Sequence, residues 1–472
     1  MLRFFKSSLP AQLLALLVLV LALRLPLLWL GLPVTAAELR ALLVGERLHS
    51  GAMLYRDLYD GTAPLAAATF AVLDAVLSRP VALYRAFALV LLLVQALRLN
   101  LVFNRYEVHP ERGYVAALTY LVVGSVSIDL DALSPLLLGH TFIVFALSAL
   151  LPTSREGYDN RRLFRAGFLI GVGALCYLPL ALFLVVGLFA VIIFAANSFR
   201  SSLLLLCGFS FPYALVATFF FYTGALPGFV QFHLQPGLTD LITSGLPAGL
   251  QLRLLIVPVL VLALALLRSL STSLGLVFQI KFRQMMLVWL VVAIATAAVE
   301  RGTAPGVLVL TLPPLAYFSL FLWQRHRRPW MLELLLLLIL NSAVVLRYRA
   351  QVPGLEAFLR MPAESRFGLR PDPRYAALRG QTLLILGPDD RAYFNNHPAT
   401  PYLDWALSQV DFGHLMEYAA VVRVAQKIGP SPPTYLLDQS AQVPRLKQLL
   451  PSIFGAYEPT GTPGLYRRRP KN

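Results

Sequence analysis

The sequence predicts an all-α polytopic membrane protein of about eleven transmembrane helices, with a small C-terminal extracytoplasmic α/β domain. Three observations support this fold class. The 472 residues are 58% hydrophobic and 14% charged, and their mean hydropathy of +0.69 is too high for a soluble chain of this length. Several apolar runs reach the roughly 17–25 residues that cross a bilayer. Many arginines lie in short loops between these runs, as expected where loops face the cytoplasm.

The apolar runs are placed in order along the chain. Arg3 and Lys6 precede the first run, so the N-terminus is expected on the cytoplasmic side. That run has no small-residue cleavage site and is expected to stay as a helix. Residues 164–196 are too long for one helix, and Pro179 should break them. The predicted spans are residues 11–32, 83–103, 113–128, 135–152, 164–178, 179–196, 202–224, 252–268, 284–300, 305–323 and 330–347.

Residues 63–78 are apolar but are predicted to lie on the outer surface. If they crossed, every later loop would change sides, and the arginine-rich loops would face outward, against the usual charge bias. Asp74 would also sit at mid-bilayer at a cost of several kcal/mol. With this segment outside, the C-terminus is extracytoplasmic as well.

The net charge of +16 does not indicate nucleic-acid binding, because the loop arginines already account for much of it. The two cysteines, Cys176 and Cys207, lie inside apolar runs. They therefore predict neither a disulfide framework nor a thiolate metal site.

The first outer loop, residues 33–82, is the most polar stretch near the N-terminus. Apolar and charged residues alternate at helical spacing over residues 36–50, and Thr35 with Glu38 fits a capping box. This predicts an amphipathic helix in the plane of the membrane surface. Gly51 ends it, a turn with Tyr55 and Asp57 follows, and Pro64 begins a second interfacial helix. The carboxylate of Glu38 could serve as a cap, a general base or a metal ligand, and these roles can coexist.

Other polar residues are expected on the same side of the membrane, and each has two interpretations. Asp129 and Asp131 either mark the water interface or bind a divalent cation together with phosphate oxygens. Glu300 and Arg301 form either an interfacial salt bridge or, through Arg301, a contact to a lipid-linked phosphate. His233 is a surface histidine or a ligand. Arg24, inside the first span, needs a partner or must reach the interface; the sequence does not identify that partner.

The composition changes after Tyr348, which places a domain boundary between residues 1–348 and 353–472. The tail is richer in Pro, Gly and charge. Its runs "TLLIL" and "TYLLD" predict strands, and residues 402–428 predict helix. The tail is expected to be a small α/β domain, too short for catalysis of its own.

Several short motifs resemble the GT-C superfamily of membrane glycosyltransferases, which use polyprenyl-phosphate-linked sugars, in particular its mannosyltransferase and aminoarabinose-transferase members. The order of motifs carries the resemblance: an acidic residue in the first outer loop, "SGAMLYRDLYDGTAPLAA", "ALYRAFALVLLL", "DLDALSP", and "ERGTAPGVLVLTLPPLAYF". It covers most of the chain, but each motif is short. Two positions depart from the pattern: Ala37-Glu38 stands where an Asp-Glu pair is usual, and Ala63 stands in place of a second Pro.

The resemblance implies a glycosyltransferase that acts on a cell-envelope acceptor at the outer face. Glu38 would be the general base, Asp129 or Asp131 would support a cation such as Mg²⁺ or Mn²⁺ or the acceptor, and Arg301 would hold the lipid phosphate. Glu300, Tyr55, Asp57 and His233 are further candidates for substrate binding. The style of the loops fits a bacterial inner membrane. Two alternatives stay open: a non-catalytic scaffold of the same fold, suggested by Ala37, and a lipid or polysaccharide transporter, which the charge-poor spans disfavour.

Overall fold

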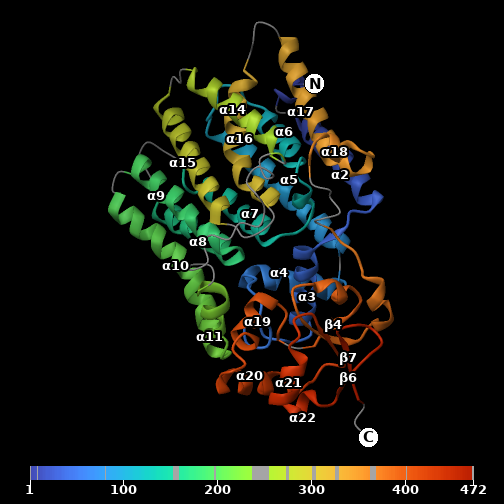
Figure 1. Cartoon of the computed structure of the whole chain (residues 1–472). Coiled ribbons are helices and arrows are strands. Elements are labelled where there is room, and N and C mark those ends of the chain that lie inside the picture. Colours follow the sequence, from blue (N-terminus) through green and yellow to red (C-terminus); the bar gives the residue numbers. More distant parts are fainter. Residues whose placement is uncertain are drawn as a thin grey trace. The chain divides into compact units, whose positions relative to one another are not determined.

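The computed structural model describes residues 2–7, 9–79, 81–151, 159–195, 198–235, 253, 255–272, 276–299, 304–324, 329–361, 368–399 and 401–469, and these are mostly helical (Figure 1). By its contacts the chain forms two compact units. Unit 1 comprises Met1–Leu32, Ala82–Val216 and Asp240–Arg366. Unit 2 comprises Pro33–Val81, Ala217–Thr239 and Phe367–Asn472. The domain boundary predicted near residues 348–353 remains an expectation, and the compact units group the first outer loop with the tail.

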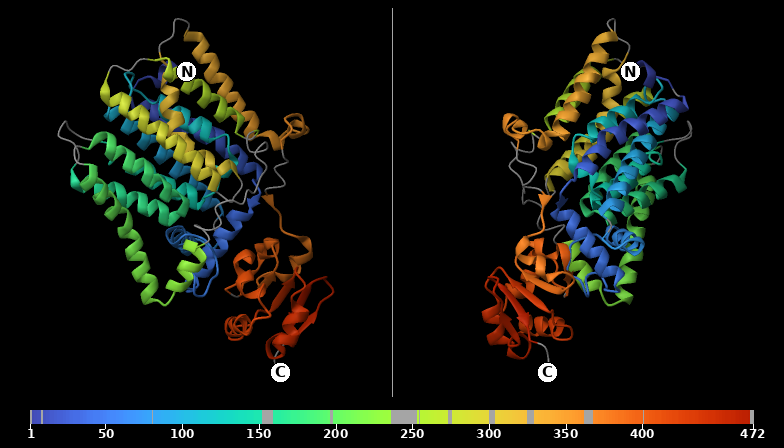
Figure 2. Two further views of the ribbon diagram at one scale, coloured as in Figure 1. Left: turned by 60° about the vertical axis from the view of Figure 1, so that its left-hand side comes forward. Right: turned by 90° about the vertical axis from the view of Figure 1, so that its right-hand side faces the viewer.

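Unit 1 is a bundle whose long helices lie side by side in both views of Figure 2. Every predicted span overlaps one of its helices. The helices are α2 (Pro10–Leu30), α5 (Val81–Arg105), α6 (Val115–Gly124), α7 (Pro135–Leu147), α8 (Asn160–Cys176), α9 (Leu184–Phe194), α10 (Ser198–Tyr222), α14 (Ile256–Leu270), α15 (Val277–Val299), α16 (Leu308–Leu322) and α17 (Pro329–Arg347).

Five of the described helices are long and apolar enough to cross a membrane: Pro10–Leu30, Val81–Arg105, Phe199–Tyr222, Val277–Ala298 and Trp330–Arg347. The remaining apolar helices of the bundle have 10–17 residues. The chain is thus an integral membrane protein, while the full set of eleven crossings and their orientation stay predictions.

Helix α16 is buried along most of its length and packs against α6, α14 and α15. It contains Pro313 and Pro314, and a proline cannot donate to the carbonyl four residues before it. Pro314 therefore cannot form the helical hydrogen bond to the carbonyl of Leu310. The indole nitrogen of Trp289 on α15 donates to that carbonyl instead, at 3.1 Å. This side-chain bond explains how a Pro-Pro pair is accepted inside an apolar helix.

The predicted break at Pro179 is present. Helix α8 ends at Cys176, Tyr177 is extended, and a 3-10 helix, η2 (Leu178–Phe183), leads into α9. Helices α8 and α10 approach closely through glycines: a side chain at Gly167 would meet the Leu205 carbonyl at 2.0 Å, and one at Gly208 would meet the Phe164 carbonyl at 2.2 Å. Small residues at such crossings allow two helix backbones to touch.

The first outer loop lies in unit 2 and has the predicted local structure. A short strand, β1 (Val34–Thr35), leads into α3 (Ala36–His49), and α4 (Pro64–Val76) packs against α3. Gly51 follows α3 with a φ of 93°, a left-handed conformation that favours glycine. Whether α3 and α4 lie in the membrane surface stays a prediction.

The tail is built on a five-stranded mixed sheet with the order β4-β3-β5-β7-β6. Figure 1 labels its strands β4, β7 and β6. Its strands are β3 (Thr382–Leu386), β4 (His397–Pro398), β5 (Tyr435–Asp438), β6 (Tyr457–Pro459) and β7 (Leu465–Arg468). Its helices are η7 (Pro373–Leu378), η8 (Asp390–Asn395), α19 (Trp405–Phe412), α20 (Tyr418–Ile428), α21 (Val443–Leu449) and α22 (Pro451–Phe454). The predicted strands "TLLIL" and "TYLLD" correspond to β3 and β5, and α19 and α20 fall in the predicted helical stretch.

Strand β3 lies between β4 and β5 and runs parallel to both. The chain leaves β3 towards β4 on one side and later returns to β5 on the other. In open α/β sheets, ligands usually bind beyond the carboxyl ends of the strands. Asp390 follows β3, and Asp404 follows β4.

Candidate functional site

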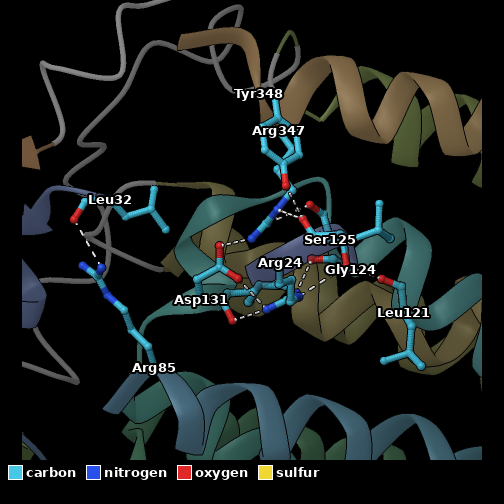
Figure 3. Close-up of polar contacts among 11 residues, drawn as sticks. Arg24, Leu32, Arg85, Leu121, Gly124, Ser125, Asp131, Arg347 and Tyr348 are labelled. Carbon is cyan, nitrogen blue, oxygen red and sulfur yellow. Dashed lines mark hydrogen bonds and ion pairs between the residues drawn. The ribbon is translucent and has the colours of Figure 1, made fainter. Parts of the chain in front are cut away.

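Unit 1 contains a buried cluster of three charges, Arg24, Asp131 and Arg347, which we call the unit 1 charge cluster. Arg24 Nη1 lies 2.7 Å from Asp131 Oδ1, and Arg347 Nη2 lies 2.6 Å from Asp131 Oδ2. The side chains are 1%, 5% and 0% exposed in the order Arg24, Asp131, Arg347. Figure 3 shows both guanidinium groups converging on the one carboxylate.

The other guanidinium nitrogens in this cluster also have acceptors. Arg24 donates to the Gly124 carbonyl at 3.1 Å, the Leu130 carbonyl at 3.0 Å and Ser125 Oγ at 3.3 Å. Arg347 donates to the carbonyls of Leu23 at 2.9 Å and Ser125 at 3.1 Å. A buried charge is tolerated only when it is paired and hydrogen-bonded, and this arrangement meets both conditions.

The partner that Arg24 requires is therefore Asp131, helped by backbone carbonyls. Arg347 is not recognisable as a partner from the sequence, because it is the last residue of the final apolar run and resembles an ordinary basic helix end. Because both oxygens of Asp131 accept from arginines, its carboxylate ties α2, the 3-10 helix η1 (Ile128–Asp131) and α17 together. Asp129 is half-buried, and its Cβ lies 3.9 Å from where a side chain at Gly306 would begin.

Within the residues that the structure describes, no group of three or more His, Cys, Asp or Glu side chains could hold a metal ion. The expectation of Mg²⁺ or Mn²⁺ at Asp129 and Asp131 therefore stays a prediction. Glu300 and Arg301 lie outside the described residues, so the predicted phosphate contact stays a prediction too.

In unit 2, Glu38 lies in the first turn of α3 and is 2% exposed. Thr35 is the N-cap, and its Oγ1 accepts from the Glu38 backbone nitrogen at 3.1 Å, so the predicted cap at Thr35 is confirmed. Strand β1 immediately before it pairs antiparallel with β2 (Gly368–Leu369), with Thr35 opposite Gly368. The start of α3 is therefore fixed by a side-chain cap and by a strand pair.

Tyr55 and His233, both predicted as substrate-binding residues, come together in unit 2. Their ring centroids are 6.2 Å apart, and both rings contact Phe229. The Tyr55 hydroxyl donates to the Thr62 carbonyl at 2.7 Å. Asp57 has a local role in the same turn: it accepts from the Met53 backbone nitrogen at 3.0 Å and pairs with Arg56.

The interpretation of His233 as a surface histidine is wrong, because it is 4% exposed. It lies in a π-helical turn, η3 (Phe229–Leu234), which stacks its ring on Phe229 at 5.4 Å. Among the described residues its Nε2 has no hydrogen-bond partner. Burial lowers the pKa of His233 to about 4, opposed by a hydrogen bond to the backbone of Gly61. His233 is therefore neutral at pH 7.

A second cluster of charges lies at the carboxyl edge of the parallel strands in unit 2: Arg40, Asp60, Asp390 and Asp404, which we call the unit 2 charge cluster. Arg40 of α3 lies 2.8 Å from Asp404 and 3.5 Å from Asp390. Asp390 follows β3, and Asp404 is the N-cap of α19. Asp60 is 1% exposed; its Oδ1 accepts from the Thr62 nitrogen at 2.7 Å, and its Oδ2 has no hydrogen-bond partner among the described residues.

Burial and charge act against each other in this cluster. Burial raises the pKa of Asp390 to about 6, although Arg40 lowers it. Burial also raises the pKa of Asp60. For Arg40 burial lowers the pKa, but Asp404, Asp60 and Asp390 together outweigh burial and raise it. Arg40 is therefore a fixed cation among three carboxylates, two of which protonate more readily than usual.

This cluster is not evident from the sequence, because Arg40 fits the polar face of an amphipathic helix. A usable signal was present in the tail: "GPDD" directly follows the strand "TLLIL", and Asp404 precedes a helix. Acidic residues at the carboxyl ends of strands are candidates for a functional edge.

No protein-family model matches this chain, and no curated protein matches it. Two solved structures from Archaeoglobus fulgidus are similar. The apo oligosaccharyltransferase is 13% identical with a TM-score of 0.44, and the match covers 78% of this chain and 57% of that one. The oligosaccharyltransferase AglB in complex with an inhibitory peptide and a dolichol-phosphate is 12% identical with a TM-score of 0.46, and the match covers 97% and 74%. At this level the likeness assigns no role to any residue here.

Proposed function

We propose that this chain is a membrane glycosyltransferase that moves a sugar from a polyprenyl-phosphate-linked donor to a cell-envelope acceptor at the outer face of the membrane. The observation that supports this most is the setting of Glu38. It is a buried carboxylate in the first turn of α3, shortly after the membrane helix α2 along the chain. This is the place where the resemblance to the GT-C superfamily expects its acidic residue.

The proposed reaction is a substitution at the anomeric carbon of the donor sugar. Glu38 takes the proton of an acceptor hydroxyl, whose oxygen then attacks the anomeric carbon. The bond from that carbon to the phosphate oxygen breaks, and its electron pair leaves with the polyprenyl phosphate. A positioned general base contributes about 10²–10⁴-fold to such a step. Because the lipid tail stays in the bilayer, the phosphate must lie at the membrane surface.

The other candidates have supporting roles in this proposal. Arg301 would stabilise the charge that develops on the departing phosphate, and Glu300 would orient it. Asp129 would hold the acceptor or a divalent cation. Asp131 would act indirectly, because its two oxygens are already bound by Arg24 and Arg347. Tyr55, Asp57 and His233 would shape the acceptor side.

The test is transfer of a labelled sugar from a polyprenyl phosphate in reconstituted lipid vesicles. Glu38→Gln keeps the size of the side chain and removes the base, so we expect a fall in rate of about 10²–10⁴-fold. Glu107→Gln is the matched control, since Glu107 is an exposed carboxylate that pairs with Arg112 in unit 1. Equal transfer by wild type and Glu38→Gln would exclude Glu38 as the base.

A second function is kept open by Ala37, which stands where the resemblance expects another acid. In that case the chain is a non-catalytic scaffold of the same fold. Purification from native membranes separates the two proposals. A scaffold retains a stable protein partner and shows no sugar transfer, whereas an enzyme transfers sugar without that partner.

A further inference from the structure

We propose that the C-terminal α/β sheet holds helix α3 in place, and that Arg40, ion-paired with Asp390 and Asp404 at the edge of that sheet, is a positioning residue for Glu38. The catalytic role of Glu38 rests on the proposed function, whereas the attachment of α3 to the tail does not. The proposal assigns a task to the tail, which otherwise has no evident chemistry of its own.

First, Arg40 binds at the edge formed by the carboxyl ends of strands β3 and β4. Asp390 begins η8 just after β3, and Asp404 caps α19 after β4, so both lie at the edge where an α/β sheet usually receives its ligand. Here the group at that edge is a side chain of the same protein. Arg40 contacts both carboxylates, and α3 also contacts β4.

The second step is that α3 is tied to the tail along its whole length. Before the helix, Val34 pairs with Leu369 across β1 and β2. In its second turn, Arg40 binds Asp390 and Asp404. Near its end, Glu46 is in hydrogen-bond contact with His397 at the start of β4. Glu38 lies between the first and second of these ties, so its position depends on the tail.

The third step is that the segment after α4 is anchored to the same part of the tail. Arg79 donates to the carbonyls of Tyr393 and Phe394 at 2.8 Å each, and to the carbonyl of Asn396. It also lies 2.6 Å from Glu46 of α3. These carbonyls close η8, which begins with Asp390. Arg40 therefore binds the start of η8, and Arg79 binds its end.

The fourth step is that the loop between α3 and α4 pairs with the tail backbone. The Tyr59 nitrogen donates to the Pro401 carbonyl at 2.6 Å, and the Asp404 nitrogen donates to the Tyr59 carbonyl at 3.2 Å. Asp60 follows directly and adds its buried carboxylate to the field of Arg40 and Asp404. The unit 2 charge cluster is thus formed jointly by the first outer loop and the tail.

The holding should depend on pH. Arg40 faces Asp60, Asp390 and Asp404, and Asp390 in turn faces Arg40, Asp404, Asp389 and Tyr393. At pH 7 the unit 2 charge cluster has three acids near one arginine, and ionised carboxylates repel one another. Protonation of Asp390 as the pH falls towards 5 removes part of this repulsion and leaves the closer Asp404 contact in place.

The test is hydrogen–deuterium exchange of the full-length protein in lipid nanodiscs, read on the peptide of residues 36–49. Rates are corrected for the intrinsic effect of pH. We expect Arg40→Ala to speed exchange of this peptide by roughly tenfold at pH 7, since a charge-assisted pair is lost. Arg40→Lys should restore part of the protection. Arg56→Ala is the matched control, because Arg56 is an exposed arginine of the same loop that pairs with its neighbour Asp57.

A second variant tests the unit 2 charge cluster without changing α3. In Asp390→Asn we expect slower exchange of the 36–49 peptide at pH 7 and a smaller gain in protection at pH 5 than in wild type. The proposal is overturned if Arg40→Ala exchanges like Arg56→Ala, or if both Arg40→Ala and Arg40→Lys leave protection at the wild-type level.

Measurements of sugar transfer distinguish this proposal from the proposed function. If transfer is observed, Arg40→Ala should lower kcat more than it raises KM for a polyprenyl-phosphate sugar, with partial rescue by Arg40→Lys. A raised KM with kcat unchanged would contradict the positioning role. If Glu38→Gln transfers like wild type, the proposed base is excluded, while an exchange difference at α3 still supports the holding by the tail.

Discussion

The two charge clusters of this protein use opposite ratios of cation to anion. The unit 1 charge cluster has two arginines around one aspartate, and the unit 2 charge cluster has one arginine among three aspartates. In unit 1 the side chains are almost fully buried and backbone carbonyls accept the remaining guanidinium protons. In unit 2 the Arg40 side chain is 38% exposed, and one oxygen of Asp60 has no described partner.

This difference shows what each cluster is suited to. Arginine keeps its proton at any physiological pH, so a cluster of two arginines and saturated acceptors is a permanent tie between helices. Carboxylates with raised pKa values change their charge in mildly acidic solution, so an acid-rich cluster can respond to pH. The first cluster holds the bundle together, and the second can adjust the hold of the tail on α3.

The largest expected effect comes from breaking the unit 1 charge cluster at its centre. Asp131→Asn leaves two buried guanidinium groups without a counter-charge, and removing one partner of a buried pair costs about 3–5 kcal/mol. We expect a large fall in the thermal midpoint of the full-length protein in detergent or nanodiscs. Glu107→Gln, which removes an exposed pair with Arg112, is the control. A midpoint for Asp131→Asn equal to that of the control would show that the cluster does not hold the bundle.

A smaller effect is expected from removing the arginine of the unit 2 charge cluster. Arg40→Met keeps the length of the side chain and leaves three carboxylates together, but solvent reaches part of the site. We expect a loss of about 1–3 kcal/mol in the unfolding free energy of unit 2, typical of a hydrogen bond to a charged group. The loss should shrink at pH 5, because the remaining acids can protonate. Unfolding curves at pH 7 and pH 5 test this; an equal loss at both values contradicts it.

These two clusters also show where prediction from the sequence stops. The helices around residues 24 and 347 and the capped helix at Thr35 follow from apolar runs and local motifs, which act over a few residues. The partners of the buried charges do not follow from such local patterns. Asp131 and Arg347 are 216 residues apart in the chain, and Arg40 and Asp404 are 364 apart.

Local patterns also cannot tell which side of a short helix is covered. His233 was open to a surface interpretation because its neighbours include Gly, Pro and Gln. Its burial depends on a π-helical turn and on Tyr55, which is far away in sequence. The expected meeting of Glu38, Asp129, Asp131 and Arg301 stays a prediction, because these residues belong to different compact units or lie outside the described residues.

The next effect concerns pH alone. The pKa of Asp390 is raised in the folded protein to about 6 from its ordinary value near 3.8, so the folded state binds this proton more tightly than the unfolded state. The unfolding free energy of unit 2 should therefore fall as the pH rises from about 4 to about 6 and level off above that. Asp390→Asn should flatten this dependence, with a residual slope of the same sign from Asp60. Denaturation at pH 4.5, 5.5 and 7 measures it, and an unchanged slope contradicts the assignment.

The smallest effect sharpens the comparison by testing an ion pair that belongs to neither cluster. Arg469 and Glu458 form an ion pair at the surface of the tail, with side chains 68% and 50% exposed. Water and salt screen such a pair, and exposed pairs contribute about 0–1 kcal/mol. Arg469→Ala should therefore leave the thermal midpoint and its pH dependence close to wild type. A loss as large as that of Arg40→Met would mean that short N–O distance alone, rather than burial and neighbouring charge, sets the strength of ion pairs in this protein.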